Sequence, residues 1–287
     1  MRGVEDDKLS ESSSSERALL GSLRKGESVR SIAEIRALLK EATPESFPAL
    51  ECALASDERK GVQQALATAR RRIEREEQEH ARLMRLYTFE QELADGKVVV
   101  GLDEVGRGPL AGPVSVGAVV LDPAAAFIEG LNDSKQIAEA KRPAIADEVK
   151  RSARAFSVVH IPSEDIDKFG IMACLKRAFK TAVINIEAQG IVPEVILLDG
   201  NPLGFDAREI NVVKGDARCA SIAAASVIAK VERDALMVEY DQVYPGYDLA
   251  SSKGYGSAAH RRAIAEKGLT PIHRVSYCKN FTEDRSL

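Results

Sequence analysis

The spacing of apolar residues divides the chain into parts with different expected structures. Residues 28–95 carry apolar side chains every three or four positions, which predicts amphipathic helices. After Asp95-Gly96 the pattern changes to short β-branched runs between turn residues, which predicts an α/β domain over residues 96–287. Residues 1–27 are polar and serine-rich without apolar periodicity, and we expect a disordered tail there.

The helical region is expected to contain a short helix and a long one. Ser31 and Glu34 have capping-box spacing at the start of the first helix, which ends before Pro44. Asp57 is predicted to be the N-cap of the second helix, which runs to Leu93. The middle of this helix mixes both signs of charge and has little apolar face, which is typical of a solvated helix between two packed regions. This region could bind the duplex or position the second region, and its acidity favours a packing or orienting role.

The second region alternates between strand patterns and helix patterns. Five runs have the length and composition of strands, at residues 97–103, 114–121, 155–161, 194–200 and 208–213. Helices are predicted at residues 171–187 and 219–238, and the second is so rich in Ala and Ser that it can pack closely. Three strands, a helix, two strands and a helix predict the α/β class, with a mixed sheet flanked by helices.

Composition and charge narrow the range of functions. A hydrophobic share of 45% supports a folded core, and a net charge of −4 argues against a protein that coats nucleic acid by bulk attraction. Residues 251–287 are locally basic, with seven Lys/Arg against three acids, and are expected to form a basic helical C-terminal segment. The four cysteines lack paired spacing, which predicts neither zinc nor disulfides and favours a cytoplasmic location. The sequence shows no secretory signal and no apolar run of about 20 residues, so we expect no membrane span.

Four carboxylates fall next to the ends of predicted elements. Asp103 and Glu104 end the first strand, Asp199 ends the fourth, and Asp216 lies in the loop before the last core helix. Each alone has an ordinary explanation: a solvated turn, a turn before glycine, or an N-cap. Together they would repel one another unless a proton or metal ion neutralises them, and all-oxygen ligands favour Mg²⁺ or Mn²⁺. Neighbours on a strand face opposite ways, so Asp103 and Glu104 can face one ion only if the strand bends or ends there.

Six motifs of the second region occur in one order. They are GLDEVGRGPLAGPV at 101–114, LNDSK at 131–135, LLDGN at 197–201, KGDARCASIAAASVIAKVERD at 214–234, KGYG at 253–256 and HR at 273–274. As a set they resemble bacterial ribonuclease HII, the type 2 ribonuclease H, over nearly all of residues 97–281. The stretch at 57–66 and the helix after it look like the N-terminal extension of a longer subgroup of this family.

The resemblance implies a ribonuclease H-like α/β fold with a helical N-terminal extension. It implies an endonuclease that hydrolyses the RNA strand of RNA/DNA hybrids and cuts at single ribonucleotides in duplex DNA. Cleavage would use two metal ions, Mg²⁺ or Mn²⁺, and leave 3′-OH and 5′-phosphate ends. By resemblance, the metal-binding and catalytic acids are Asp103, Glu104, Asp199 and Asp216.

The resemblance also assigns the contacts that recognise the substrate. Gly106, Arg107 and Gly108 match a loop that reads the ribonucleotide 2′-OH, the group that distinguishes RNA from DNA. Glycine lets the backbone approach a sugar closely, and arginine offers a planar fork for a phosphate. Tyr255 matches a tyrosine that packs on the next deoxyribose, and Lys135 is either a phosphate contact or a solvated turn lysine.

Several alternatives stay open from the sequence. Lys230 and Asp234 have the spacing of an ordinary helix salt bridge, and His260 and His273 are expected to contact phosphates or to be structural. A type 3 ribonuclease H, with a preference for longer RNA tracts, shares the acid chemistry. A non-catalytic hybrid-binding protein would use the basic C-terminus, and an aspartyl-phosphate signalling domain would use Asp199 as acceptor. We expect a monomer that acts on RNA/DNA hybrids and on ribonucleotide-containing duplex DNA.

Overall fold

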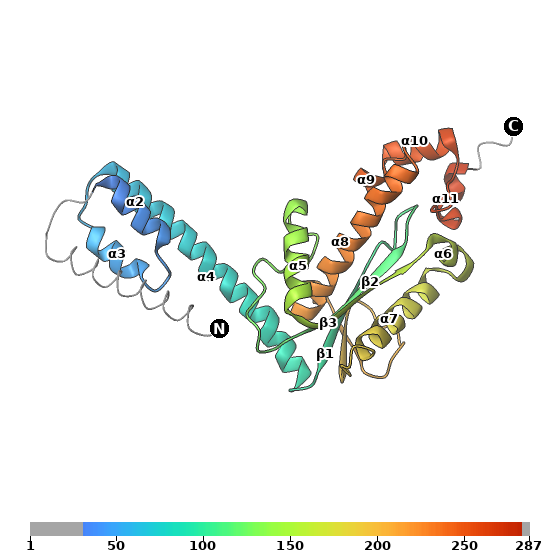
Figure 1. Ribbon diagram of the computed structural model, residues 1–287, viewed down its shortest axis with the longest axis horizontal. Coiled ribbons are helices and arrows are strands. Elements are labelled where there is room, and N and C mark those ends of the chain that lie inside the picture. The colour runs from blue at the N-terminus through green and yellow to red at the C-terminus, as the bar shows by residue number, and fades with distance from the viewer. Residues whose placement is uncertain (1–30, 283–287) are drawn as a thin grey trace. The chain divides into compact units, whose positions relative to one another are not determined.

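The computed structural model describes residues 31–282, which form two compact units (Figure 1). The first unit comprises residues 31–82 and the second residues 83–282. Helix α4, Lys60–Ala94, gives its first turns to the first unit and its last turns to the second. The tail predicted at residues 1–27 lies outside the described residues. Among the helices of residues 31–282, none has the length and apolar character that crossing a membrane requires.

The first unit consists of α2 (Ile32–Glu41), α3 (Phe47–Leu54) and the start of α4. The predicted capping box is confirmed: the Ser31 hydroxyl accepts from the Glu34 backbone N–H, and the Glu34 carboxylate accepts from the Ser31 N–H at 2.8 Å. Helix α3 was not predicted. The core is formed by apolar side chains from all three helices, namely Ile35, Leu39, Phe47, Leu50, Leu54, Val62, Leu66 and Ile73.

The prediction of Asp57 as the N-cap of the long helix is wrong. Helix α4 begins at Lys60, and the carbonyl of Arg59 accepts from the N–H groups of the first turn. The Asp57 carboxylate is instead held by the Arg59 guanidinium at 2.6 Å. The ion pair with Arg59 therefore occupies the Asp57 carboxylate, and the helix starts three residues after Asp57. The solvated middle is confirmed, because residues 74–78 are all exposed.

The second unit is built on a five-stranded mixed sheet of order β3-β2-β1-β4-β5. Strand β1 runs antiparallel to β2 and parallel to β4; β2–β3 is antiparallel and β4–β5 parallel. The bounds are Val99–Val105 (β1), Val114–Leu121 (β2), Ala153–Ile161 (β3), Val195–Asp199 (β4) and Glu209–Val212 (β5). The predicted mixed α/β sheet is therefore confirmed.

Helices cover both faces of the sheet (Figure 1). Helix α7 (Ile171–Glu187) packs on one face with Val100 and Leu102 of β1, and α8 (Ala220–Val243) packs on the other with Val119 of β2. The smaller elements are η1 (Glu139–Lys141), α5 (Arg142–Ser152), α6 (Ser163–Phe169), η2 (Gly215–Ala217), α9 (Leu249–Ser252), α10 (Ala258–Lys267) and α11 (Val275–Thr282). The predicted helical character of the C-terminal segment is thus confirmed for its described part.

Helix α8 lies unusually close to the sheet. A Cβ on Gly101 of β1 would stand 2.3 Å from the Ser221 hydroxyl oxygen, and one on Gly117 of β2 would stand 2.3 Å from the Ala225 carbonyl oxygen. No side chain fits at either position, so glycine in the strands and small residues in the helix permit this contact. Asp103, two residues after Gly101 on the same face of β1, therefore lies beneath α8.

Candidate active site

Asp103 and Glu104 lie inside β1, not at its end as predicted. The strand continues to Val105 because β2 pairs with it that far, with Glu104 opposite Val116. Pairing with β4 stops earlier, at Leu102 opposite Leu198. The two acids thus occupy the part of β1 that has β2 on one side and no β4 partner on the other. Asp199, the last residue of β4, comes directly after that point.

Asp103 is the most deeply buried of the four acids. Its side chain is 6% exposed and hydrogen-bonds with Ser226 of α8. Burial raises the pKa of Asp103 to about 8, and the charges of Glu104 and Asp199 add to the shift. The Ser226 hydroxyl also lies 2.9 Å from the hydroxyl of Ser134, which joins the LNDSK segment to the same group. An ionised Asp103 therefore needs a cation beside it.

Glu104 is directed toward the loop that follows β1. Its Oε1 accepts from Arg107 Nη1 at 3.1 Å. Burial raises the pKa of Glu104, and the Arg107 charge opposes that shift. Because β1 does not end at Asp103, the alternation of strand side chains separates Glu104 from Asp103 in direction, although their charges still interact.

Asp199 and Asp216 are joined through the backbone of η2. Asp199 Oδ1 accepts from the Gly215 N–H at 2.6 Å, which fixes the turn that carries Asp216 next to the end of β4. Asp216 is 9% exposed, and its pKa is raised by burial and by the charge of Asp199. Asp216 is not an N-cap, because α8 begins at Ala220 after Cys219.

Lys135 brings a positive charge to this acid group. Its Nζ lies 3.7 Å from Asp216 Oδ2 and 3.8 Å from Asp133 Oδ1. Asp133 was not identified as a site residue from the sequence, although it belongs to the LNDSK motif. The Lys135 side chain is 75% exposed, so the ammonium group stands between the acids and solvent.

Glu90 of α4 is a further acid that sequence reasoning missed. Its Oε2 accepts from both the N–H and the hydroxyl of Ser221 at 2.7 Å, in the first turn of α8. Cys219 offers α8 no side-chain cap, so Glu90 satisfies a donor that the helix start would leave free. The sequence contains one indication of this role, because Glu90 falls within the apolar stripe formed by Leu83, Leu86 and Ala94. Glu90 thereby anchors the helix that carries Ser226.

The donor set of this site suits a hard divalent cation, because every candidate ligand is a carboxylate oxygen. Burial, together with the charges of Glu104 and Asp199, raises the pKa of Asp103, and a cation beside it would favour the ionised form. Within residues 31–282, no three acidic, histidine or cysteine side chains converge tightly enough to hold an ion as they stand. The residues present therefore fit such an ion by chemistry and by charge, with side-chain rotation needed for coordination.

The loop after β1 is held from below by Arg274. This side chain is fully buried and donates to the carbonyl oxygens of Gly106 at 2.6 Å, Arg107 at 2.8 Å and Gly112 at 2.9 Å. Burial lowers the pKa of Arg274 to about 10, and the nearby charge of Arg233 adds to the shift. The backbone of the predicted sugar-reading loop thus has a fixed conformation.

A second buried arginine joins this loop to the KGYG segment. Arg233 of α8 donates to Pro113 O at 2.9 Å and Lys253 O at 3.0 Å. Gly106 has φ +88°, and a Cβ there would lie 2.2 Å from Arg233 Nε, so a side chain at this position is excluded twice over. Neither arginine was predicted as a site residue, since their partners are backbone carbonyls.

The structure places Tyr255 beside the loop that follows β1. A Cβ built on Gly108 would meet the Tyr255 ring at 3.9 Å, and the ring is largely accessible, with 46% of the residue exposed. His260 Nδ1 lies 2.9 Å from the Tyr255 carbonyl oxygen, and its Nε2 lies 3.0 Å from His273 Nε2. Both histidines are buried, so of the two roles expected they have the structural one.

The remaining sequence-derived pair behaves as an ordinary ion pair. Lys230 Nζ lies 2.8 Å from Asp234 Oδ1 along α8, which confirms the predicted helix salt bridge. The structure therefore brings Asp103, Asp199, Asp216 and Lys135 together at one end of the β1–β4 pair. Glu104 and Arg107 connect that group to the loop beside Tyr255.

Comparisons with known proteins match both units. Residues 100–280 match the family model for Ribonuclease HII, and residues 31–94 match the model for the Ribonuclease HII N-terminal domain. A Ribonuclease HII from Listeria monocytogenes serotype 4b is 43% identical over 249 residues, which is 86% of this chain and 94% of the relative. A Ribonuclease HII from Lachnoclostridium phytofermentans is 43% identical over 228 residues, 79% of this chain and 88% of the relative.

Solved structures share the fold of the second unit. The ribonuclease H2 of Pyrococcus horikoshii OT3 aligns with a TM-score of 0.55 and 26% identity, over 65% of this chain and 97% of that one. The Mn²⁺ complex of Bst-RNase HIII aligns with a TM-score of 0.54 and 20% identity, over 66% of this chain and 70% of that one.

Proposed function

The chain belongs to the ribonuclease HII family, and we propose that it cuts RNA/DNA hybrids on the RNA strand and also cuts at single ribonucleotides in duplex DNA. It is a ribonuclease H enzyme, and its products in this proposal carry 3′-OH and 5′-phosphate ends. The observation that carries the proposal is the position of the GRG loop, which leaves β1 directly after Asp103 and Glu104. A group that reads a sugar thus stands next to a group that can cut beside it.

The proposed cofactor is Mg²⁺ or Mn²⁺, held by the carboxylates of Asp103, Asp199 and Asp216 and by Glu104, through either its side chain or its backbone carbonyl. A pair of such ions supplies activation of water and stabilisation of the leaving oxygen. The raised pKa of Asp103 supports this assignment, because a buried acid among other acids is stabilised by a cation. The Mn²⁺ complex of Bst-RNase HIII, which shares the fold of the second unit, also supports the assignment.

The chain's own residues bind and orient the substrate in this proposal. Gly108 is exposed and offers backbone groups to a ribose, whose 2′-OH both donates and accepts a hydrogen bond, while the buried Gly106, with φ +88°, sets the turn that brings Gly108 there. Arg107 lies at the surface and can exchange its contact with Glu104 for a phosphate. Tyr255 offers an exposed ring for the next deoxyribose, and Lys135 reaches a phosphate beside the acids.

The proposed setting is the cytoplasm, where the enzyme acts as a monomer on duplex substrates. All four cysteines are free thiols, which suits a reducing compartment. The acids, the GRG loop and Tyr255 all come from one chain, so no second copy is needed to complete the site.

The deciding experiment offers purified protein three duplexes with Mg²⁺ or Mn²⁺. One carries a single embedded ribonucleotide, one is an all-RNA strand on DNA, and one is all DNA. We expect cleavage of the first two at the ribonucleotides, no cleavage of the third, and no activity in EDTA. Cleavage of the all-RNA hybrid without cleavage at the single ribonucleotide would favour the type 3 alternative and overturn the proposal.

A further inference from the structure

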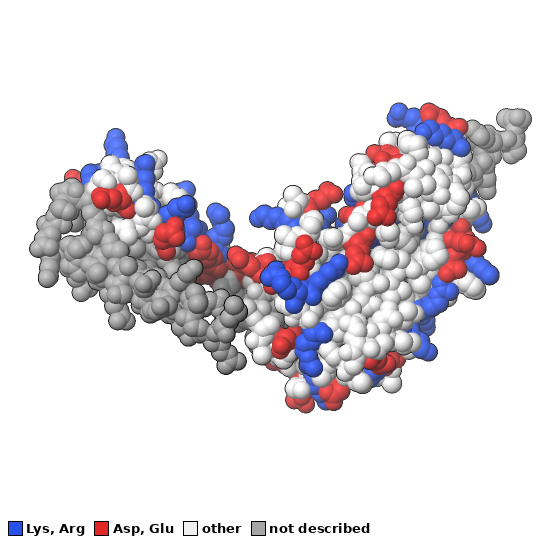
Figure 2. Space-filling model, in the orientation of Figure 1, with Lys and Arg blue, Asp and Glu red and all other residues white. Residues whose placement is uncertain are grey.

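A pair of buried histidines in the second unit takes no direct part in the proposed reaction. Figure 2 shows Lys/Arg and Asp/Glu side chains on the surfaces of both units. By contrast, His260 of α10 and His273, two residues before α11, are 0% and 2% exposed. Their Nε2 atoms lie 3.0 Å apart, and Tyr247 packs against both rings. A role in the reaction would therefore have to pass through another residue.

The hydrogen bonds of this pair have one direction. The Thr270 backbone N–H can only donate, and it lies 2.9 Å from His273 Nδ1, so this nitrogen accepts. The proton of a neutral His273 ring is then on Nε2, from which it is donated to His260 Nε2. The proton of His260 is therefore on Nδ1, 2.9 Å from the Tyr255 carbonyl oxygen, which can only accept. Burial lowers the pKa of both histidines, which favours the neutral rings that this order requires.

This series of hydrogen bonds ends on the main chain of Tyr255. The Tyr255 carbonyl accepts from His260 and from the Ser257 N–H at 2.8 Å, and the Tyr255 N–H donates to the Ser252 carbonyl at 3.0 Å. Tyr255 itself is 46% exposed. Since almost half of the residue is open to solvent, the position of its ring depends chiefly on the main chain that carries it.

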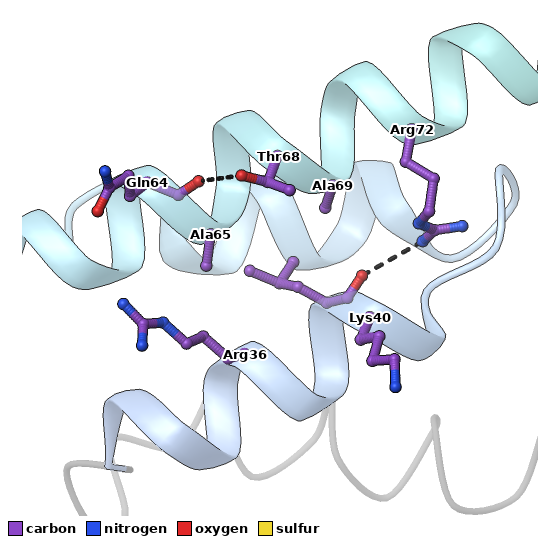
Figure 3. Close-up of a pocket in the computed structure, with 8 residues that line it drawn as sticks. Arg36, Lys40, Gln64, Ala65, Thr68, Ala69 and Arg72 are labelled. Carbon is purple, nitrogen blue, oxygen red and sulfur yellow. Dashed lines mark hydrogen bonds between the residues drawn. The ribbon is translucent and has the colours of Figure 1, made fainter.

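A side chain of the first unit makes a comparable contact. Figure 3 shows Arg72 of α4 donating to the Leu39 carbonyl, which holds the end of α2. Most side-chain hydrogen bonds in proteins are made to main-chain groups or water, and those to the main chain order the segment that they reach. His260 differs from Arg72 in what it holds, because Tyr255 carries a ring beside the GRG loop.

The segment around Tyr255 is also joined to the loop that follows β1. The Gly254 carbonyl accepts from the Leu110 N–H at 2.8 Å, and Ala111 forms an antiparallel β-bridge with His273. The histidine that orients His260 is thus paired with the loop as well. The position of Tyr255 is therefore set relative to that loop.

We propose that His260 is a positioning residue for Tyr255 and that His273 orients it, so that the ring stands beside Gly108 before a substrate arrives. The inference rests on the proposed function for the contact between Tyr255 and the deoxyribose that follows the ribonucleotide. A group fixed in advance loses less conformational freedom on binding. An all-RNA strand has no deoxyribose at that position, so the histidines contribute mainly to cleavage at single ribonucleotides.

The test compares two variants that replace different nitrogens of His260. His260→Asn places an amide nitrogen where Nδ1 stood, so it keeps a donor for Tyr255 and loses the link to His273. His260→Gln places its amide where Nε2 stood, so it keeps that link and loses the donor. On the single-ribonucleotide duplex, His260→Gln should raise KM about fivefold, the effect of one lost hydrogen bond, with kcat within about twofold of the wild type. His260→Asn should change neither value more than about twofold, and the KM for the all-RNA hybrid should stay unchanged in both variants.

The controls follow the ratio of KM on the single-ribonucleotide duplex to KM on the all-RNA hybrid. Tyr247→Phe loses a buried hydrogen bond of the same cluster, from Tyr247 to the Gly268 carbonyl at 2.9 Å, and should leave the ratio unchanged. In the Tyr255→Ala protein, His260→Gln should also leave it unchanged, because no ring remains to be positioned. Nitrogen NMR of the wild-type chain should show the proton of His260 on Nδ1 and that of His273 on Nε2.

The inference can fail separately from the proposed function. In an enzyme that cuts both duplexes, equal KM changes in His260→Asn and His260→Gln would overturn the inference alone, as would an unchanged ratio in both. An effect of His260→Gln that persists in the Tyr255→Ala protein would also overturn it. So would a proton on Nε2 of His260, which the wild-type spectrum reports even where a variant does not fold. A protein that cuts neither duplex would instead overturn the proposed function.

Discussion

The second unit buries charge of both signs, in two regions that are stabilised in different ways. Burial raises the pKa of Asp103 to about 8 and lowers the pKa of Arg274 to about 10, so in each region burial disfavours the charged form. Arg274 and Arg233 are compensated by backbone carbonyl oxygens at 2.6–3.3 Å. The acids have one another's charges nearby, and Lys135 lies beside Asp216.

The difference lies in whether the partner can leave. The carbonyl groups of Gly106 and Pro113 belong to the chain itself, so the hydrogen bonds of the two arginines persist as long as the fold does. These arginines therefore have a structural role. The acids have no comparable set of fixed donors, and a soluble cation can come and go between them. In this fold, the buried acids without full compensation form the proposed catalytic site. The fully compensated arginines support the loop beside it.

The largest effect is expected from removing an acid. Asp103→Asn should lower turnover about a hundredfold or more, because metal ligation contributes several kcal/mol to the transition state. Folding and hybrid binding should persist, since the amide keeps the shape and removes a buried charge. Steady-state cleavage and a binding titration measure the two properties, with the exposed Asp147→Asn as the control. Unchanged turnover in Asp103→Asn would support the non-catalytic hybrid-binding alternative.

A smaller effect is expected from removing an arginine. Arg274→Met leaves the carbonyls of Gly106, Arg107 and Gly112 without their donor, and should lower the free energy of unfolding by about 3 kcal/mol. Arg274→Lys should recover only part of this, because lysine lacks the planar fork. Urea unfolding measures the loss, and the exposed Arg262→Met is the control.

The same variant tests whether the loop positions the substrate. Arg274→Met should lose more activity on the single-ribonucleotide duplex than on the all-RNA hybrid, since only the former depends on one correctly placed sugar contact. Equal losses on both substrates would show that Arg274 supports stability without positioning the loop.

The smallest effect concerns the histidine pair beneath Tyr255. Burial lowers the pKa of His273 to about 4 and lowers that of His260 as well. The unfolded chain binds these protons near pH 6.5, so stability is complete above that pH and falls as the pH decreases toward 4. NMR of the imidazole carbons should show the His273 ring neutral at pH 6 and the pKa of His260 below its ordinary value, with the exposed His80→Asn leaving these signals unchanged. If either ring of the pair titrated at or above pH 6.5, the lowered pKa values expected from burial would be contradicted.

The sequence allowed prediction of the elements whose signals are local. The span of α7 agrees at both ends, and the strands are found because β-branched runs are short and bounded by turns. The acids could be proposed because each follows an apolar strand or precedes a helix. The extension of β1 to Val105 was missed because it depends on pairing with Ser115 of β2, which no residue of β1 reveals.

The rest of the site depends on contacts between distant segments. Glu90 meets Ser221 across 131 positions, and Arg274 meets Gly106 across 168. The partners of both arginines are main-chain carbonyls, which every residue has, so no residue type could identify them. Asp57 pairs with the neighbouring Arg59 and does not cap α4.

The close packing of α8 on Gly101 and Gly117 also sets a fixed spacing. Ser226, which contacts Asp103, and Arg233, which lies against Gly106 and donates to the Pro113 carbonyl, are seven residues apart on this helix, about 10 Å along its axis. Neither strand can slide beneath α8, because any side chain or shift at the glycines would collide with it. Under the proposed roles, the number of nucleotides between the recognised sugar and the broken bond is therefore determined by the helix and is the same for every sequence that the enzyme meets.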